Sequence, residues 1–523
     1  MATSASASVR GAQTYRPVTV TGLAGLLDAP VRERPDARAL VAGGERTALS
    51  YRTLHAHTGY VAARLAGAGL RPGDVVGLVA RNTAEFVVAL LGAARAGLVT
   101  APLDPDLGES DLRLRVAEVG ARAVIAAPGV PAADQVPRPG VPVADWVLRV
   151  DGENAGLTGA AGPDRKPPPG LAPDDALILF TAGTTRRPRM VPLTHSNIAA
   201  SVQGICTSYE LGPRDATVAV MPFFHGHGLF ATLLATLASG GCVLLPAAGR
   251  FSAAAFWDDL RAARATWFTA VPTIHETLLD CSGAQYPAPL PPPLRFVRSC
   301  NAPLNAASQR ALERTFGAPL LSAYGMTESA HQIASEPLPA RGPLKHGSVG
   351  RATGVRLRVV DEAGRRCPPG VRGEVWVRGA AVTRGHLPRP GAGKREFADG
   401  WLRTGDLGSL DEDGYLFLAG RIENLIVRGG RKISPEYVED VLTGCPSVAE
   451  AAVFAVPDEV GGQRVGAAVV VRGEECAGPE EILRYCRGRL AAAAVPERIV
   501  LVPSLPRTAQ GGLDRLAVRD RYA

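Results

Sequence analysis

The chain has 523 residues, more than one hydrophobic core can organise, so we expect two or more domains. Its hydrophobic content of 46% and charged content of 20% are typical of a soluble globular protein, and no apolar run is long enough to cross a membrane. The net charge of +7 comes from arginines spread along the chain without a basic block, which argues against nucleic acid and favours small anionic ligands.

The eight cysteines are scattered and form no Cys-x-x-Cys pair, which argues against a zinc ribbon or a disulfide framework and indicates reduced thiols in the cytoplasm. Residues 1–17 are rich in serine and alanine and lack the apolar core of a secretory signal. We interpret them as a flexible tail.

Residues 18–158 alternate strand-like and helix-like segments. Val75–Ala80 predicts a strand, and Thr83–Ala96 predicts an apolar-faced helix that Gly97 ends. This alternation predicts parallel sheets covered by helices. The Pro/Gly-rich segment Gly159–Pro173 predicts a surface linker.

A small-residue loop follows the buried strand predicted at Ala176–Phe180. Its amides, hydroxyls and arginines can cradle phosphate. The residues concerned are Thr181, Gly183, Thr184, Thr185, Arg186, Arg187 and Arg189. The alternative is an ordinary polar turn before a helix at about 196–208, capped by Ser196 and Asn197.

Further strands are predicted at Ala216–Met221, Trp267–Val271 and Leu294–Ser299. His225 and His227 stand between the first two beside glycines, but the sequence offers no third ligand nearby, so we do not assign a metal to them.

Two later segments place polar side chains at predicted strand ends and turns. Tyr324 to Glu328 offers an aromatic ring, a hydroxyl and a carboxylate, which suit a base, a phosphate and Mg²⁺; a strand end with a helix cap is the structural alternative. Asp406 in a glycine-flanked turn suits ribose hydroxyls, although such aspartates are common.

From Gly347 onward, short strands and turns at 361–364 and 411–414 predict an antiparallel subdomain, and an α+β tail of about 100 residues begins near 421. The predicted fold is therefore α/β, with two βαβ-type sheets and a small antiparallel subdomain in the large N-terminal domain. We expect a tail at 1–17, this large domain at 18–420 and a small mobile C-terminal domain at 421–523.

In this order and spacing, the segments resemble the adenylate-forming superfamily of acyl-CoA synthetases, nonribosomal-peptide adenylation domains and luciferases, over about residues 20–520. Segments 191–202, 326–331 and 425–435 are most similar to oxalate–CoA ligases. The resemblance implies carboxylate attack on the ATP α-phosphate, rotation of the small domain, and thiol attack on the acyl-adenylate. The implied cofactors are ATP, Mg²⁺ and CoA, acting on a small acid.

The resemblance also implies residue roles. The ATP phosphates would contact Thr181, Gly183, Thr184, Thr185, Arg189 and Thr327. Adenine would contact Asn301, Ala302 and Tyr324, ribose would contact Asp406 and Arg421, and Mg²⁺ would bind Glu328. Glu423 would mark the hinge between the domains, and Gly429 and Gly430 would border the pantetheine tunnel. His225, His227 and His331 would donate to the small anion. Thr327, Glu328 and His225 are therefore the catalytic candidates.

The sequence departs from the family pattern at two places. In the phosphate loop, Ala182, Arg186, Arg189 and Met190 replace serine, glycine, lysine and glycine. At the C-terminal signature, Gly512 replaces the catalytic lysine that bridges the carboxylate and the α-phosphate. Arg507 and Arg515 are the cations nearest in sequence, which makes Arg507 a further catalytic candidate.

These departures leave three functions open. The first is an ATP-dependent, AMP-forming ligase that passes a small acid to CoA. The second is a diazotase-like enzyme of natural-product pathways that activates nitrite for attack by an amine. The third is a catalytically impaired nucleotide-binding homologue, against which the retained Tyr324, Thr327, Glu328, Asp406 and Arg421 argue.

Overall fold

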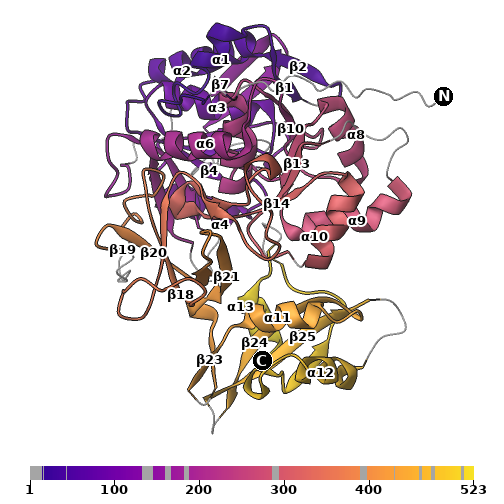
Figure 1. Cartoon of the computed structure of the whole chain (residues 1–523). Helices are drawn as coiled ribbons and strands as arrows, with labels where there is room; N and C mark the ends of the chain where they lie inside the picture. The colour runs from indigo at the N-terminus through magenta and orange to yellow at the C-terminus, as the bar shows by residue number, and fades with distance from the viewer. Residues whose placement is uncertain are drawn as a thin grey trace, which may run out of the picture.

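A computed structural model describes residue 15 and residues 17–42, 44–131, 145–159, 166–181, 188–285, 294–304, 306–388, 397–428, 430–458, 462–472, 478–507 and 512–523. Figure 1 shows a large body, coloured indigo to orange, and a smaller C-terminal domain, coloured orange to yellow, at one end of it. Over the described ranges, no helix has both the length and the apolar character that a membrane span needs.

The first sheet of the large body is mainly parallel, in the order β7-β6-β5-β3-β4-β8-β9, with β7 and β9 antiparallel at its edges. Helices α2 and α3 share a core cluster with one face and α4 shares another with the opposite face, so both faces are covered. The elements are β3 (Val75–Val79), β4 (Val99–Leu103), β5 (Ala123–Ala126), β6 (Trp146–Asp151), β7 (Asn154–Gly159), β8 (Asp175–Phe180), β9 (Met190–Thr194), α1 (Asp28–Glu33), α2 (Tyr51–Gly67), α3 (Ala84–Arg95) and α4 (Glu109–Glu118).

The second layer consists of a four-stranded sheet, β10-β11-β1-β2, and a five-stranded sheet, β12-β13-β14-β15-β16. They adjoin where the amide of Thr266, just before β12, donates to the carbonyl of Ala216 in β10, 2.8 Å away. The strands are β1 (Arg38–Ala42), β2 (Thr47–Ser50), β10 (Ala216–Val218), β11 (Cys242–Leu244), β12 (Trp267–Ala270), β13 (Phe296–Ser299), β14 (Leu320–Met326), β15 (His331–Ser335) and β16 (Arg351–Ala352). The accompanying helices are α6 (His195–Tyr209), the π-helical η1 (His227–Leu234), α7 (Ala235–Ala238), α8 (Ala253–Ala263), α9 (Pro272–Gln285), α10 (Ala306–Phe316) and the 3₁₀ turns η2 (Thr327–Ser329) and η3 (Pro339–Arg341).

The antiparallel subdomain and the C-terminal domain complete the chain. The subdomain contains β17 (Arg356–Val360), β18 (Gly373–Arg378), β19 (Phe397–Ala398), β20 (Trp401–Leu410) and β21 (Leu416–Arg421). The C-terminal domain contains η4 (Ile422–Asn424), β22 (Ile426–Arg428), β23 (Arg431–Ile433), α11 (Pro435–Thr443), β24 (Val448–Asp458), β25 (Gly462–Val471), α12 (Pro479–Arg487), η5 (Ala492–Ala494), β26 (Arg498–Leu501) and α13 (Arg515–Tyr522). The α/β fold with an antiparallel subdomain and an α+β C-terminal part is confirmed.

Three local predictions were wrong. Asp406, expected in a glycine-flanked turn, lies inside the strand β20 and pairs there with Arg421 of β21. The cap of α6 is Thr194, not Ser196 and Asn197: the Thr194 hydroxyl accepts from the Asn197 amide and the Asn197 side chain accepts from the Thr194 amide, both at 3.0 Å. The strand expected at 216–221 ends at Val218 because the Asn82 side chain donates to the carbonyls of Ala219 and Met221, in place of a neighbouring strand.

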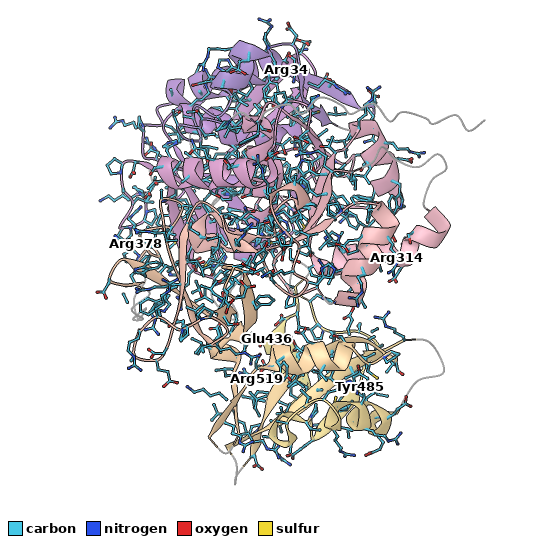
Figure 2. The ribbon with its side chains drawn as sticks, in the orientation of Figure 1. Arg34, Arg314, Arg378, Glu436, Tyr485 and Arg519 are labelled. Atoms are coloured by element: carbon cyan, nitrogen blue, oxygen red, sulfur yellow. The ribbon has the colours of Figure 1, made fainter. Side chains whose placement is uncertain are left out.

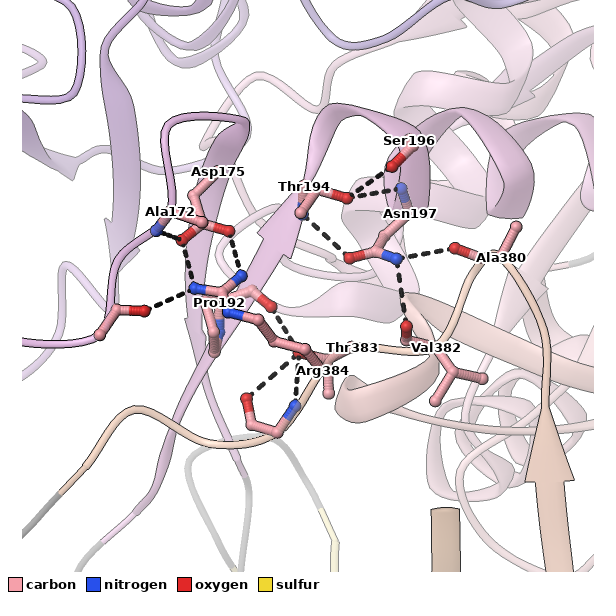
Figure 3. Close-up of polar contacts among 12 residues, drawn as sticks. Ala172, Asp175, Pro192, Thr194, Ser196, Asn197, Ala380, Val382, Thr383 and Arg384 are labelled. Atoms are coloured by element: carbon pink, nitrogen blue, oxygen red, sulfur yellow. Dashed lines mark hydrogen bonds and ion pairs between the residues drawn. The ribbon is translucent and has the colours of Figure 1, made fainter. Parts of the chain in front are cut away.

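A polar clamp ties the segment after β18 to the strands on either side of the phosphate loop (Figure 3). Arg384 makes a two-pronged ion pair with Asp175 at the start of β8, with both N–O distances 2.6 Å. The Thr383 hydroxyl donates to the Pro192 carbonyl in β9 at 2.6 Å, and the Asn197 side chain donates to the carbonyls of Ala380 and Val382. The clamp therefore fixes residues 380–384 toward the end of the β8–β9 hairpin that lies opposite the phosphate loop.

The substitution Asp175→Asn is expected to lower the free energy of unfolding of the large domain by about 2 kcal/mol. The Asp175 side chain is fully buried, whereas Arg384 is 39% exposed and regains water when its partner is neutralised, which limits the loss. Denaturant unfolding of the variant measures the change. The control is Asp36→Asn. Asp36 pairs with Arg52 but its side chain is 80% exposed, so this variant should change the free energy of unfolding by less than about 0.5 kcal/mol. Equal effects for the two variants would contradict the role of the clamp.

Candidate active site

Three of the residues expected to hold the nucleotide meet at one carboxylate. Asp406 in β20 pairs in register with Arg421 in β21, and the Arg421 Nε atom donates to Asp406 Oδ1 at 2.8 Å. The Tyr324 hydroxyl, from β14, donates to the other oxygen, Oδ2. Burial raises the pKa of Asp406, and Arg421 opposes this effect. The aromatic ring, the carboxylate and the guanidinium thus form one unit at the junction of the β14 sheet and the antiparallel subdomain.

Glu328 lies beside this unit in the 3₁₀ turn η2. Its Oε1 atom is 2.9 Å from Nε2 of His386, and its carbonyl accepts from the amide of Thr383 at 2.8 Å. Both side chains of the Glu328–His386 pair are mostly buried. Segment 380–388 therefore contacts Glu328, the expected Mg²⁺ ligand, at two points: His386 contacts its side chain, and the Thr383 amide contacts its backbone carbonyl.

The base of the phosphate loop is closed by a reciprocal pair of hydrogen bonds. The Thr181 amide donates to the Arg189 carbonyl at 2.9 Å, and the Arg189 amide donates to the Thr181 hydroxyl at 3.0 Å. Gly183, Thr184 and Thr185, together with Gly429, lie outside the described residues.

The remaining nucleotide and tunnel candidates occupy turns. Asn301 and Ala302 follow the end of β13 and are exposed, and Asn301 has a left-handed φ of 78°. Gly430 lies in the turn between β22 and β23 with a φ of 77°, which favours glycine.

The histidines expected near the acid form one cluster, in which His227 and His331 are buried and His225 is half-buried. His227 is the first residue of η1 and His331 the first of β15, and their rings stack with centroids 5.0 Å apart. The His227 amide donates to Nδ1 of His225 at 3.3 Å. Arg298 from β13 reaches Nε2 of both His227 and His331, each at 3.1 Å. Because His331 pairs with Met326 across β14 and β15, the cluster lies next to Thr327 and Glu328.

Close backbone contacts explain why glycines flank these histidines. A Cβ atom on Gly228 would lie 2.3 Å from the Pro222 carbonyl oxygen, and one on Gly325 would lie 1.5 Å from that of His331. His331 itself has a φ of 86°, a conformation that costs a non-glycine residue of order 1 kcal/mol or more. Such strain is often found at functional sites.

The imidazoles of the cluster are neutral at pH 7. Burial lowers the pKa of His225 to about 4, and burial followed by the positive Arg298 lowers the pKa of His331 well below its usual value. For His227, burial is the largest cause of a strongly lowered pKa, followed by His331 and Arg298. The cluster therefore offers neutral N–H donors alongside one permanent charge.

The buried His275, next to this cluster, should make the free energy of unfolding depend on pH. It is fully buried, and burial lowers its pKa to about 4. The unfolded chain, with a histidine pKa near 6.5, binds more protons between these values, so stability falls as the pH drops from about 6.5 to 4. Removing this one group should reduce that fall by about 3 kcal/mol at most. Urea unfolding of the parent and His275→Gln over this range tests the slope, and identical slopes would contradict the assignment.

The C-terminal candidates are engaged within their own domain. Arg507 Nη2 lies 2.7 Å from Glu450 Oε2, and Arg515 makes a two-pronged pair with Glu439 at 2.7 and 2.8 Å. Gly512 is exposed between them. Recruiting either guanidinium to a phosphate would therefore require an existing ion pair to break.

Two residues of the site were not identified from the sequence. Arg298 could have been found, because an arginine inside a strand that is otherwise buried signals a polar site. His386 is a single histidine beside a glycine, and nothing local to it indicates contact with Glu328.

Comparison with known proteins agrees with this geometry. Residues 27–387 match the family described as AMP-binding enzyme, and residues 437–511 match the AMP-binding enzyme C-terminal domain. An oxalate–CoA ligase of Arabidopsis thaliana is 42% identical over 96% of this chain and 98% of the relative. A sulfoacetate–CoA ligase of Cupriavidus necator is 34% identical over 94% of this chain and 96% of the relative.

Solved structures show the same architecture. ATP-bound MatB of Rhodopseudomonas palustris superposes with a TM-score of 0.83 at 30% identity, covering 95% of this chain and 99% of MatB. The o-succinylbenzoate CoA synthetase MenE of Bacillus subtilis, in complex with its acyl-adenylate, gives a TM-score of 0.79 at 26% identity, covering 97% and 99%. The chain therefore belongs to the family of AMP-binding enzymes and is an AMP-forming acid–thiol ligase.

Proposed function

We propose that this enzyme activates a dicarboxylate of the size of oxalate with ATP and transfers it to CoA. The observation that carries the proposal is the cluster of buried Arg298, His227 and His331 with half-buried His225, which lies beside Glu328. A long acyl chain would need an apolar channel there, whereas these side chains suit a short acid rich in oxygen atoms. The similarity to oxalate–CoA ligase over nearly the whole chain supports the same substrate.

The residues suit the first half-reaction as follows. Tyr324 would stack on adenine, Asp406 would accept from the ribose hydroxyls, and Thr327 and the loop closed by Thr181 and Arg189 would contact phosphate. A substrate carboxylate oxygen then attacks the α-phosphorus, and pyrophosphate leaves. Glu328 fits Mg²⁺, because His386 contacts only its Oε1 and a magnesium site built on phosphates needs few protein carboxylates. When bound, Mg²⁺ neutralises charge on the phosphates.

For the second half-reaction, the CoA thiol attacks the acyl carbon, AMP departs with the electron pair of the C–O bond, and the thiol proton passes to water. We propose that residues 421–523 move as a unit between the two steps, with Glu423 at the hinge. Arg421 contacts Glu423 at 3.2 Å, and the neighbouring Asn424 donates to Glu436 at 2.7 Å. Glu436 lies where the small domain meets the large body (Figure 2). We expect this chemistry in the cytoplasm.

A substrate panel tests the proposal. ATP–pyrophosphate exchange and CoA-dependent AMP release are measured with oxalate, malonate, sulfoacetate, ferulate, a long-chain fatty acid and nitrite. Oxalate is expected to give the highest kcat/KM. A preference for ferulate or the fatty acid would refute the polar acid site. Activity with nitrite alone would favour the diazotase-like function, and ATP binding without activity on any of these acids would favour the impaired nucleotide-binding homologue. Folded protein that fails to bind millimolar ATP would refute all three functions.

A further inference from the structure

Arg298 is a buried cation held entirely by neutral groups. Its side chain is fully buried in β13, and in the described part of the chain no carboxylate contacts it. A buried charge without a counter-ion is costly unless hydrogen bonds satisfy it. Because burying this charge costs folding free energy and the charge lies at a candidate substrate site, we infer that it has a functional role.

The hydrogen bonds of the guanidinium leave no donor for a substrate. Arginine has five N–H donors. Nε donates to the Tyr209 hydroxyl at 2.7 Å; Nη1 donates to the Thr269 hydroxyl and His227 Nε2, each at 3.1 Å; and Nη2 donates to Gln332 Oε1 at 3.0 Å and His331 Nε2 at 3.1 Å. Five donors thus meet five acceptors, so Arg298 acts on a ligand through its neighbours.

These contacts fix the protons on two imidazoles. Because a guanidinium N–H only donates, Nε2 of His331 must carry a lone pair. The same holds for Nε2 of His227, to which the Thr269 hydroxyl, 2.6 Å away, then donates its own proton while its oxygen accepts from Arg298. In a neutral imidazole the proton is then on Nδ1. The His227 Nδ1 atom is buried and has no partner among the residues that the structure describes, so its N–H is an unsatisfied donor there. An oxygen of a bound anion would satisfy it.

Three further described histidines have the opposite tautomer, as does His57, whose Nε2 lies 2.9 Å from the Gly152 carbonyl. His225 Nδ1 accepts from the His227 amide, and His195 Nδ1 accepts from the Leu23 amide at 3.2 Å, so both protons are on Nε2. His275 Nε2 contacts the Arg298 carbonyl at 3.2 Å, and a carbonyl only accepts. The two rings that face the Arg298 guanidinium therefore differ from these four.

We propose that Arg298 is a positioning residue that holds His227 and His331 in the Nδ1–H tautomer, so that both rings present N–H donors to an oxygen-rich acid. The tautomer assignment stands on the hydrogen bonds alone. Only the identity of the ligand rests on the proposed function. Specificity for a short dianion then comes from the Nδ1–H groups of His227 and His331, whose tautomers are fixed before the ligand binds. The positive charge of Arg298 lies behind these two rings and does not contact the ligand.

The direct test uses the unmodified enzyme labelled with ¹⁵N-histidine. Long-range ¹H–¹⁵N correlation separates the two tautomers, and His227→Asn and His331→Asn assign the signals by their loss. Nδ1–H is expected for His227 and His331, and Nε2–H for His225, His195 and His275. Finding Nε2–H at both His227 and His331 would overturn the proposal, whatever the substrate is.

Kinetics separate positioning from simple charge attraction. Arg298→Lys keeps the charge but has only three donors, and is expected to raise KM for oxalate at least tenfold, shift the tautomer signals and leave KM for ATP within about twofold. Arg295→Gln, which loses the Asp215 ion pair just before the same strand, is the matched control and should leave the tautomers unchanged. A lysine variant with parental KM and parental tautomers would contradict the inference. If that variant does not fold, the spectrum of the parent still decides.

Discussion

A lysine at position 512 is expected to raise ATP–pyrophosphate exchange by about 10²-fold. The resemblance to adenylate-forming enzymes implies that this position corresponds to a lysine that bridges the attacking carboxylate and the α-phosphate, and one such transition-state contact contributes about 10²–10³ in rate. Gly512 supplies none. Its neighbours in sequence do not replace it in the described structure, because Arg507 pairs with Glu450 and Arg515 with Glu439.

Exchange rates with oxalate test this expectation. Gly512→Gln, which has a long polar side chain without charge, is the matched control and should stay near the parental rate. If Arg507 does leave Glu450 to act at the phosphate, Arg507→Met will instead lose about 10²-fold and Gly512→Lys will gain little. A gain below about threefold for Gly512→Lys, with Arg507→Met also unchanged, would show that the position is not catalytic here.

Arg515 requires a separate control because its contacts are structural. It joins Glu439 and Glu436, and Glu436 in turn accepts from Asn424 beside the hinge. Its substitution therefore acts on the packing of α11 and α13 as well as on any phosphate contact. For this reason Arg507 is the more informative of the two replacement candidates.

The order of motifs predicted the broad architecture and the nucleotide candidates. Tyr324 stands in a long strand, β14, whose apolar residues are visible in the sequence, and Asp406 stands in a glycine-flanked segment. What local patterns could not predict is that Asp406 pairs with Arg421 and accepts from Tyr324, since these contacts join separate strands of two sheets. Only the family resemblance brought the three residues together.

At the acid site, the sequence predicted which residues take part but not the contacts between them. The sequence indicated three histidines, but their tautomers depend on Arg298, which comes from a different strand. Likewise, Glu328 meets His386 because the clamp of Arg384 and Thr383 folds a segment 58 residues away against it. Tertiary contacts of this kind leave no periodic signal in the chain.

The substitution Asp406→Ala is expected to weaken ATP binding by about 10²-fold. It removes the carboxylate proposed for the ribose hydroxyls and leaves the Arg421 guanidinium and the Tyr324 hydroxyl without their shared partner. Loss of a buried, charge-assisted partner typically costs about 3 kcal/mol or more. Isothermal calorimetry with ATP and Mg²⁺ measures this directly, without reliance on turnover or on the identity of the acid.

Two variants separate nucleotide binding from general damage. Tyr324→Phe keeps the ring that would stack on adenine but loses the hydroxyl, so it should weaken ATP binding by no more than about tenfold, in line with one hydrogen bond. Asp361→Ala removes a half-buried carboxylate of the same subdomain that pairs with the exposed Arg365, and should leave the affinity unchanged. The nucleotide assignment fails if Asp406→Ala is folded and binds ATP as the parent does. If Tyr324→Phe loses as much affinity as Asp406→Ala, then the hydroxyl that orients the carboxylate, rather than a direct contact with ribose, accounts for the effect.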